Sequence, residues 1–185
     1  MLISIGIDYS MTSPAICVHT GNEWSFDNCK FYYFIRKKKQ EVISDQFIHT
    51  YYPEYQHDLE RYDLLSDWSL DIIQRYKEVK KVHIEGFSYG SSGSRIFNMS
   101  ENVGLLKHKL WKSGCEIQTP APSEIKKFAS GKGNCNKEVM YDSFLSETSV
   151  DLRKELFLEK GWNPLSDIVD AYYIAKLGFT RDTTL

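Results

Sequence analysis

The stretch ISIGIDYSMTSPAICV at residues 3–18 is the part of the sequence that decides the fold. Isoleucine occupies every second position from 3 to 7, a pattern typical of a strand with one buried face. AICV at 15–18 forms a second apolar run, and the residues TSP at 12–14 between the two runs are turn-prone. Two adjacent strands are therefore predicted, with a carboxylate, Asp8, at the end of the first.

Further strands and helices alternate after this pair. The aromatic run KFYYFI at 30–35 predicts a third strand, which completes an antiparallel meander. The later elements that the periodicity predicts are a helix from about residue 58, strands at 82–86 and 116–119, and helices at 98–112, 123–129, 136–147 and 166–177. Ser123 and Ser166 are the expected N-caps of two of these helices. This order implies an α/β fold, with a mixed five-stranded sheet flanked by helices.

One segment fits neither pattern. Residues 36–57 contain the charge run RKKK, several aromatic residues and a proline. We interpret the segment as an insertion that is flexible or partly strand-forming.

The composition fits one domain over residues 1–185, with 42% hydrophobic and 26% charged residues. A net charge of −2 and a pI near 6.2 argue against a protein that coats nucleic acid by charge alone, but not against a DNA enzyme with a local basic face. The four cysteines lack zinc-site spacing and indicate a reducing, cytoplasmic compartment, that of the host if the protein is viral. The apolar start is too short for a signal peptide or a membrane span, so no membrane association is expected.

Four acids stand where predicted buried elements meet a surface. Asp8 ends the first strand and Glu85 ends the strand at 82–86, so the two share one sheet edge if these strands are parallel neighbours. Asp167 and Asp170 lie three apart on one helix and therefore share a face. Carboxylates without Cys or His suit magnesium or manganese. Two such ions can activate a water and stabilise the leaving oxygen in phosphodiester cleavage.

Taken singly, each of these acids is better explained by a structural role. Asp8 fits a strand-end turn, Glu85 a solvated loop, and Asp167 and Asp170 a first helical turn favoured by the helix dipole. Their joint placement favours the metal site.

Four stretches together carry a resemblance to a known family: GIDYSMTSPA at 6–15, IEGF at 84–87, APSEIKKFASGKGNCNK at 121–137 and SDIVDAYYIA at 166–175. They resemble the RuvC family of Holliday-junction resolvases, which have the RNase H-like fold. The resemblance implies a crossover-junction endodeoxyribonuclease that binds branched DNA, especially four-way junctions, and cuts two strands symmetrically as a homodimer. It also implies that the metal-binding catalytic acids, for magnesium or substituting manganese, are Asp8, Glu85, Asp167 and Asp170.

Lysines recur beside this predicted site. Lys137 matches the lysine that ends the glycine-loop motif of the family, which gives it a catalytic role, although a solvated lysine at a helix start is the commoner case. Local clusters of lysine can hold phosphates despite a negative total charge. The candidate DNA-binding lysines are Lys107, Lys126, Lys127, Lys132 and Lys137, and Lys107 has the neighbours His108, Lys109 and Lys112 on its helix.

Two aromatic residues follow Glu85, where the family carries a loop that probes the junction centre. Tyr89, flanked by glycine and small polar residues, is the better candidate for stacking on an unpaired base. Phe87 is a second candidate for DNA contact, but packing beneath the loop is its favoured role.

The helix at 98–112 has Met99, Val103, Leu106 and Leu110 on one stripe. The corresponding helix in the family contributes to the dimer interface, whereas a stripe of this kind is more often core.

Departures from the family pattern at 36–57, 148–165 and Asn134–Asn136 indicate a divergent member of viral or phage origin with broad action on branched DNA. The alternatives are an RNase H-like nuclease for flaps, forks or RNA–DNA hybrids, and a non-catalytic junction-binding protein. An ATPase of the same fold is disfavoured, because no second phosphate-binding glycine loop follows.

Overall fold

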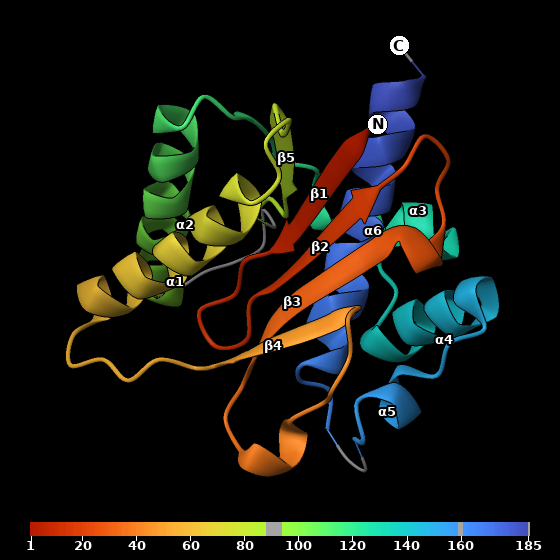
Figure 1. Ribbon diagram of the computed structural model, residues 1–185, viewed down its shortest axis with the longest axis horizontal. Helices are drawn as coiled ribbons and strands as arrows, with labels where there is room; N and C mark the ends of the chain where they lie inside the picture. Colours follow the sequence, from red (N-terminus) through yellow and green to blue (C-terminus); the bar gives the residue numbers. More distant parts are fainter. Residues whose placement is uncertain (88–93, 159–160, 185) are drawn as a thin grey trace.

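The computed structural model describes residues 1–87, 94–158 and 161–184, and in it a six-stranded sheet runs through the centre (Figure 1). The strands are β1 (Ile3–Asp8), β2 (Ala15–Thr20), β3 (Cys29–Ile35), β4 (Phe47–Tyr51), β5 (Lys81–Ile84) and β6 (Glu116–Gln118). Their order across the sheet is β4-β3-β2-β1-β5-β6. The β1–β2 and β2–β3 pairs are antiparallel, and the β3–β4, β1–β5 and β5–β6 pairs are parallel.

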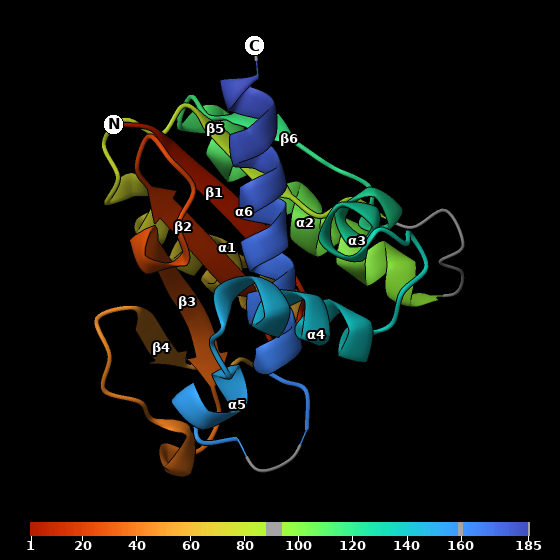
Figure 2. The same cartoon turned by 90° about the vertical axis from the view of Figure 1, so that its right-hand side faces the viewer.

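Helices cover both faces of this sheet. They are α1 (Asp58–Gln74), α2 (Ser94–Lys112), α3 (Pro122–Ser130), α4 (Lys137–Thr148), α5 (Leu152–Glu155) and α6 (Leu165–Thr183), with short 3₁₀ turns η1 (Phe26–Asn28) and η2 (Lys38–Gln40). Figure 1 shows α1 and α2 on one face, and Figure 2 shows α6 lying along the other face with α3 and α4 beside it. No helix in the described part of the chain is both long and apolar enough to cross a membrane.

Alternation along the strands divides the core between the two faces. Ile5, Ile7 and Val18 are buried on the side of α1 and α2, while Cys17 and Phe31 are buried on the side of α6. The side of α6 also holds the buried aromatic and aliphatic residues of α4 and of α6 itself. The sheet is therefore buried from both sides, as a mixed sheet between helical layers requires.

One glycine sets how closely the central strand and helix approach. A Cβ added at Gly6 in β1 would lie 2.2 Å from the amide nitrogen of Ala175 and 2.4 Å from the carbonyl oxygen of Ala171, both in α6. Real Cβ atoms do not come this close to backbone, so no larger residue fits between these elements. The residue thereby brings the first half of α6 directly against β1.

The structure confirms the predicted α/β fold and the opening meander, but the sheet has six strands instead of five. The extra strand, β4, comes from the unassigned segment 36–57, in which the predicted partial strand formation is confirmed. Both cap assignments were wrong by two residues. Ala121 and Pro164 occupy the N-cap positions of α3 and α6, and Ser123 and Ser166 lie inside the helices.

Candidate active site

Asp8 and Glu85 reach the same sheet edge because β1 and β5 are parallel neighbours. Ile7 pairs with Ile84 in the register, and the Glu85 amide donates to the Ile7 carbonyl oxygen over 3.2 Å. Asp8 directly follows Ile7, and Glu85 directly follows Ile84. Asp8 is buried and Glu85 is half-buried, as expected for carboxylates at the carboxyl ends of strands between helical layers.

The other two acids, Asp167 and Asp170, lie on α6. Asp167 lies in the first turn and is buried, and Asp170 lies one turn further along and is half-buried. Because α6 packs on Gly6, only two residues before the end of β1, its first turns stand beside Asp8. The topology thus brings three elements together, β1, β5 and α6.

The electrostatics indicate that Asp8 lies close enough to the other three acids to feel their charges. Burial raises the pKa of Asp8 well above its usual value, and the charges of Asp167, Asp170 and Glu85 raise it further. Burial also raises the pKa of Asp170 to about 7, again with the charges of Glu85 and Asp167 adding to the shift. The pKa of Asp167 rises to about 6 through burial, although a hydrogen bond with the Ser13 side chain lowers it. Four acids that resist ionisation together form a site that a cation would stabilise.

The donor set fits hard divalent cations. Carboxylate oxygens are the ligands that magnesium and manganese prefer, and Oδ2 of Asp167 is buried without a hydrogen-bond partner. Among the residues that the structure describes, however, no three Asp, Glu, His or Cys side chains converge into a closed ligand group. The side chains of Asp8 and Asp167 instead interact with each other directly, so small side-chain movements would have to accompany cation binding.

Two lysines stand close to the acids. Lys137 is the first residue of α4, its Nζ donates to Oγ of Ser166 over 3.1 Å, and its charge lowers the pKa of both Asp167 and Asp170. Lys126 of α3 lowers the pKa of Glu85 and of Asp170. Both lysines predicted at this site therefore lie within electrostatic reach of the carboxylates, where they could also meet a phosphate.

The remaining predicted lysines lie elsewhere on the molecule. Lys127 is in the last turn of α3 and Lys132 is in the loop after it, and both are exposed. Lys107 is half-buried on α2. Its neighbour Lys109 forms ion pairs with Asp63 at 2.6 Å and Asp67 at 2.5 Å, both in α1, so the expected lysine cluster on this helix is partly neutralised by the adjacent helix.

The two aromatic candidates both follow Glu85 in the sequence. Phe87 has 38% of its surface exposed. The loop beneath which it was expected to pack lies outside the described residues, so both its packing role and its DNA contact stay predictions. Tyr89 lies outside the described residues, and its predicted stacking role stays a prediction.

The sequence did not predict a role at the site for two serines that lie near the acids. The Ser13 side chain lowers the pKa of Asp167, and Ser166 accepts the hydrogen bond from Lys137. Both lie within motifs quoted above, but their local context predicted only a turn residue and a helix cap. Each is buried, which the sequence does not reveal.

Comparisons with known proteins identify the fold. No protein-family model matches the chain, and no curated protein is significantly similar to it in sequence. Three solved structures are similar over nearly the whole chain. Thermus thermophilus RuvC in complex with a Holliday junction has a TM-score of 0.61 at 17% identity, with 100% of this chain and 98% of that chain covered.

Two further solved structures are similar to this chain in fold. The fowlpox virus resolvase in complex with Holliday-junction DNA has a TM-score of 0.53 at 14% identity, covering 97% of this chain and 98% of that chain. The yeast mitochondrial Holliday junction resolvase Ydc2 has a TM-score of 0.54 at 14% identity, covering 96% and 77%. The chain therefore has a mixed α/β fold of the kind seen in these structures. More particularly, it has the fold of RuvC and the related resolvases, at the low identity of a divergent sequence.

Proposed function

We propose that the protein is a divalent-metal-dependent endonuclease that resolves four-way junctions and other branched DNA. The observation that carries the proposal is that β1, β5 and α6 meet at one sheet edge and bear the four acids Asp8, Glu85, Asp167 and Asp170 there. A protein that only binds phosphates gains nothing from buried acids, because they repel the backbone. The acids therefore favour a catalytic role over a binding-only role.

The residues divide into two groups in this mechanism. The four carboxylates would hold two magnesium ions, or manganese in their place, and such ions would supply the activation of water and the stabilisation of the leaving oxygen in phosphodiester hydrolysis. Lys137 and Lys126 supply positive charge at the rim, where the scissile phosphate and the strand beside it approach. Ser166 fixes the Lys137 ammonium group, which orients its charge toward the acids.

A panel of labelled substrates tests this function. With magnesium present, the purified protein is expected to cut a synthetic four-way junction faster than a linear duplex of the same sequence, with two cuts placed symmetrically. A flap, a fork and an RNA–DNA hybrid complete the panel, because an RNase H-like nuclease of different specificity is the second candidate. Preferential cutting of the hybrid, or of the flap alone, would replace the junction proposal with that alternative.

We infer further that the protein acts as a homodimer, because a four-way junction presents two equivalent strands to a two-fold symmetric protein. Most of the predicted α2 stripe is unavailable for this purpose: Val103, Leu106 and Leu110 are buried in the protomer, and Met99 is 38% exposed. On another side of α2, Phe97 is 70% exposed and Trp111 is 67% exposed. They lie about four turns apart on one side of the helix, as the anchors of a helix-to-helix interface do.

The dimer proposal predicts the behaviour of a Trp111→Asp variant. A charge at a buried interface centre is strongly unfavourable, so we expect the variant to sediment as a monomer at concentrations where the wild type is a dimer. Analytical ultracentrifugation measures this, with Leu59→Asp as a matched change at an exposed apolar position of α1. A dimeric Trp111→Asp variant would rule out this face as the interface.

A further inference from the structure

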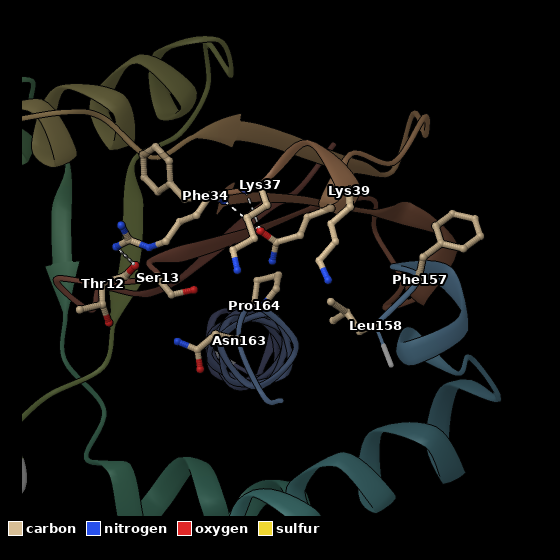
Figure 3. Close-up of a pocket in the computed structure, with 11 residues that line it drawn as sticks. Thr12, Ser13, Phe34, Lys37, Lys39, Phe157, Leu158, Asn163 and Pro164 are labelled. Atoms are coloured by element: carbon tan, nitrogen blue, oxygen red, sulfur yellow. Dashed lines mark hydrogen bonds between the residues drawn. The ribbon is translucent and has the colours of Figure 1, made fainter. Parts of the chain in front are cut away.

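The charge run after β3 forms one wall of a cavity that the nuclease mechanism does not use. The cavity has a volume of about 600 Å³ and lies between this turn, the β1–β2 connection and the segment leading into α6 (Figure 3). Arg36, Lys37 and Lys39 line it on one side. Facing them are Ser13, Pro164 and the apolar side chain of Leu158. Among the residues that the structure describes, the lining contains these three basic side chains and no acidic one.

The turn that presents these charges is internally braced. The Gln40 side-chain oxygen accepts hydrogen bonds from the amides of Arg36, at 3.1 Å, and Lys37, at 3.0 Å. The Arg36 guanidinium donates to the Thr12 carbonyl oxygen over 3.1 Å and lies 3.8 Å from the centre of the Tyr52 ring. Such bracing reduces the ordering cost of ligand binding.

Both lysines of this turn point into the cavity. Lys37 and Lys39 are exposed, and Figure 3 shows both side chains extending across the cavity toward Pro164 and Leu158. Among the described residues, neither lysine belongs to an ion pair. An ammonium group in this position carries three donors that can bind an anion.

The cavity adjoins the acidic site directly. Ser13 lines the cavity, and its side chain lies near enough to Asp167 to lower the pKa of that carboxyl. Pro164 immediately precedes α6, and Asp167 follows it by about one helical turn, roughly 5 Å along the axis. A DNA strand whose scissile phosphate reaches the acids would therefore have neighbouring phosphates beside this cavity.

We propose that Arg36, Lys37 and Lys39 form a phosphodiester-binding site that holds the cleaved DNA strand next to the scissile phosphate. The proposal rests on the nuclease function inferred above, because that function supplies the strand. Phosphate contacts position a strand without reading its sequence, so the site favours register and orientation over base specificity. A free mononucleotide offers the same phosphate chemistry, but it lacks the successive phosphates that several separated cations can engage.

Affinity for a four-way junction tests this site in the full-length protein. We expect the Lys37→Ala/Lys39→Ala variant to lose affinity on the order of 10- to 100-fold at about 0.1 M salt, since two phosphate contacts disappear. The slope of log affinity against log salt should also fall by about two. Fluorescence anisotropy in EDTA measures both quantities without cleavage. The Lys37→Arg/Lys39→Arg variant keeps the charges and should bind as the wild type does.

Lys38 provides the matched control, because it belongs to the same run and is exposed but does not line the cavity. If the site is specific, Lys38→Ala should change the affinity for the four-way junction less than twofold. An equal loss in Lys38→Ala, or wild-type binding by the double alanine variant, would overturn the site and leave the nuclease proposal standing. Tighter binding of thymidine monophosphate than of an oligothymidylate would also overturn it. Intact lysine-dependent binding without any cleavage would instead support the site and contradict the nuclease function.

Discussion

The Asp8→Asn variant is expected to cut a four-way junction at least about a hundredfold more slowly than the wild type. Removing one group that stabilises the transition state electrostatically typically lowers the rate constant by about this factor. Asparagine has the same shape but lacks the negative charge that holds a divalent cation. Single-turnover cleavage with saturating protein and magnesium measures the loss in the chemical step. Junction affinity in EDTA should be retained or increased, since a negative charge near the phosphates is gone.

The same variant is expected to be more stable than the wild type when no divalent ion is present. Burial and the other three acids raise the pKa of Asp8 above its unfolded value of 3.8, so ionising it costs more in the folded state. At pH 3 the carboxyl is protonated in both states, and the two proteins should unfold alike. As the pH rises from about 4, the wild type loses stability and the variant does not share this loss. The difference should be largest at pH 8.

Thermal unfolding in EDTA from pH 3 to pH 8 checks this behaviour, with Asp71→Asn as the control. Asp71 is exposed on α1, far from the acids in the sequence and on the opposite face of the sheet. Its replacement should change neither cleavage nor the pH dependence of the melting temperature. Wild-type cleavage by Asp8→Asn would contradict the assignment of the catalytic acids, and an unchanged melting temperature at pH 8 would contradict the raised pKa of Asp8.

Much of the fold was predictable because its signals are local. The alternation in β1 and the aromatic run in β3 each mark a strand without reference to the rest of the chain. By contrast, β4 is short, with five residues and no alternation of apolar and polar side chains, and it becomes a strand by pairing with β3 from Phe31 to Ile35. Its structure depends on a neighbour, which explains why periodicity left the segment unassigned.

The acidic site was predictable for a different reason. Strand ends and helical spacing gave Asp8, Glu85, Asp167 and Asp170 a common location once β1 and β5 were taken as parallel neighbours. The cavity beside it was not predictable, because Lys37 and Pro164 are more than 120 positions apart in the sequence. The charge run was visible, but the surface facing it depends on how the segment before α6 folds.

The largest expected effect on stability comes from adding one methyl group at Gly6. In the Gly6→Ala variant, the new Cβ would lie 2.2 Å from the backbone nitrogen of Ala175, so β1 and α6 must separate. Overpacking against side chains costs about 1–3 kcal/mol, and backbone cannot rotate away, so we expect a loss of about 3 kcal/mol or more in the free energy of unfolding. Urea denaturation measures this loss, with a melting temperature lower by roughly 6–12 °C as an independent check.

The matched control removes one methyl group from the same strand. Ile7 is fully buried against α1 and α2, and Ile7→Val should cost only about 1 kcal/mol, because a small cavity is cheaper than a displaced helix. Separation of β1 from α6 also moves Asp8 away from Asp167. Gly6→Ala should therefore lose junction cleavage at temperatures where it remains folded, whereas Ile7→Val keeps it. A Gly6→Ala variant that is as stable and as active as Ile7→Val would contradict the close packing of β1 on α6 and its role in assembling the acids.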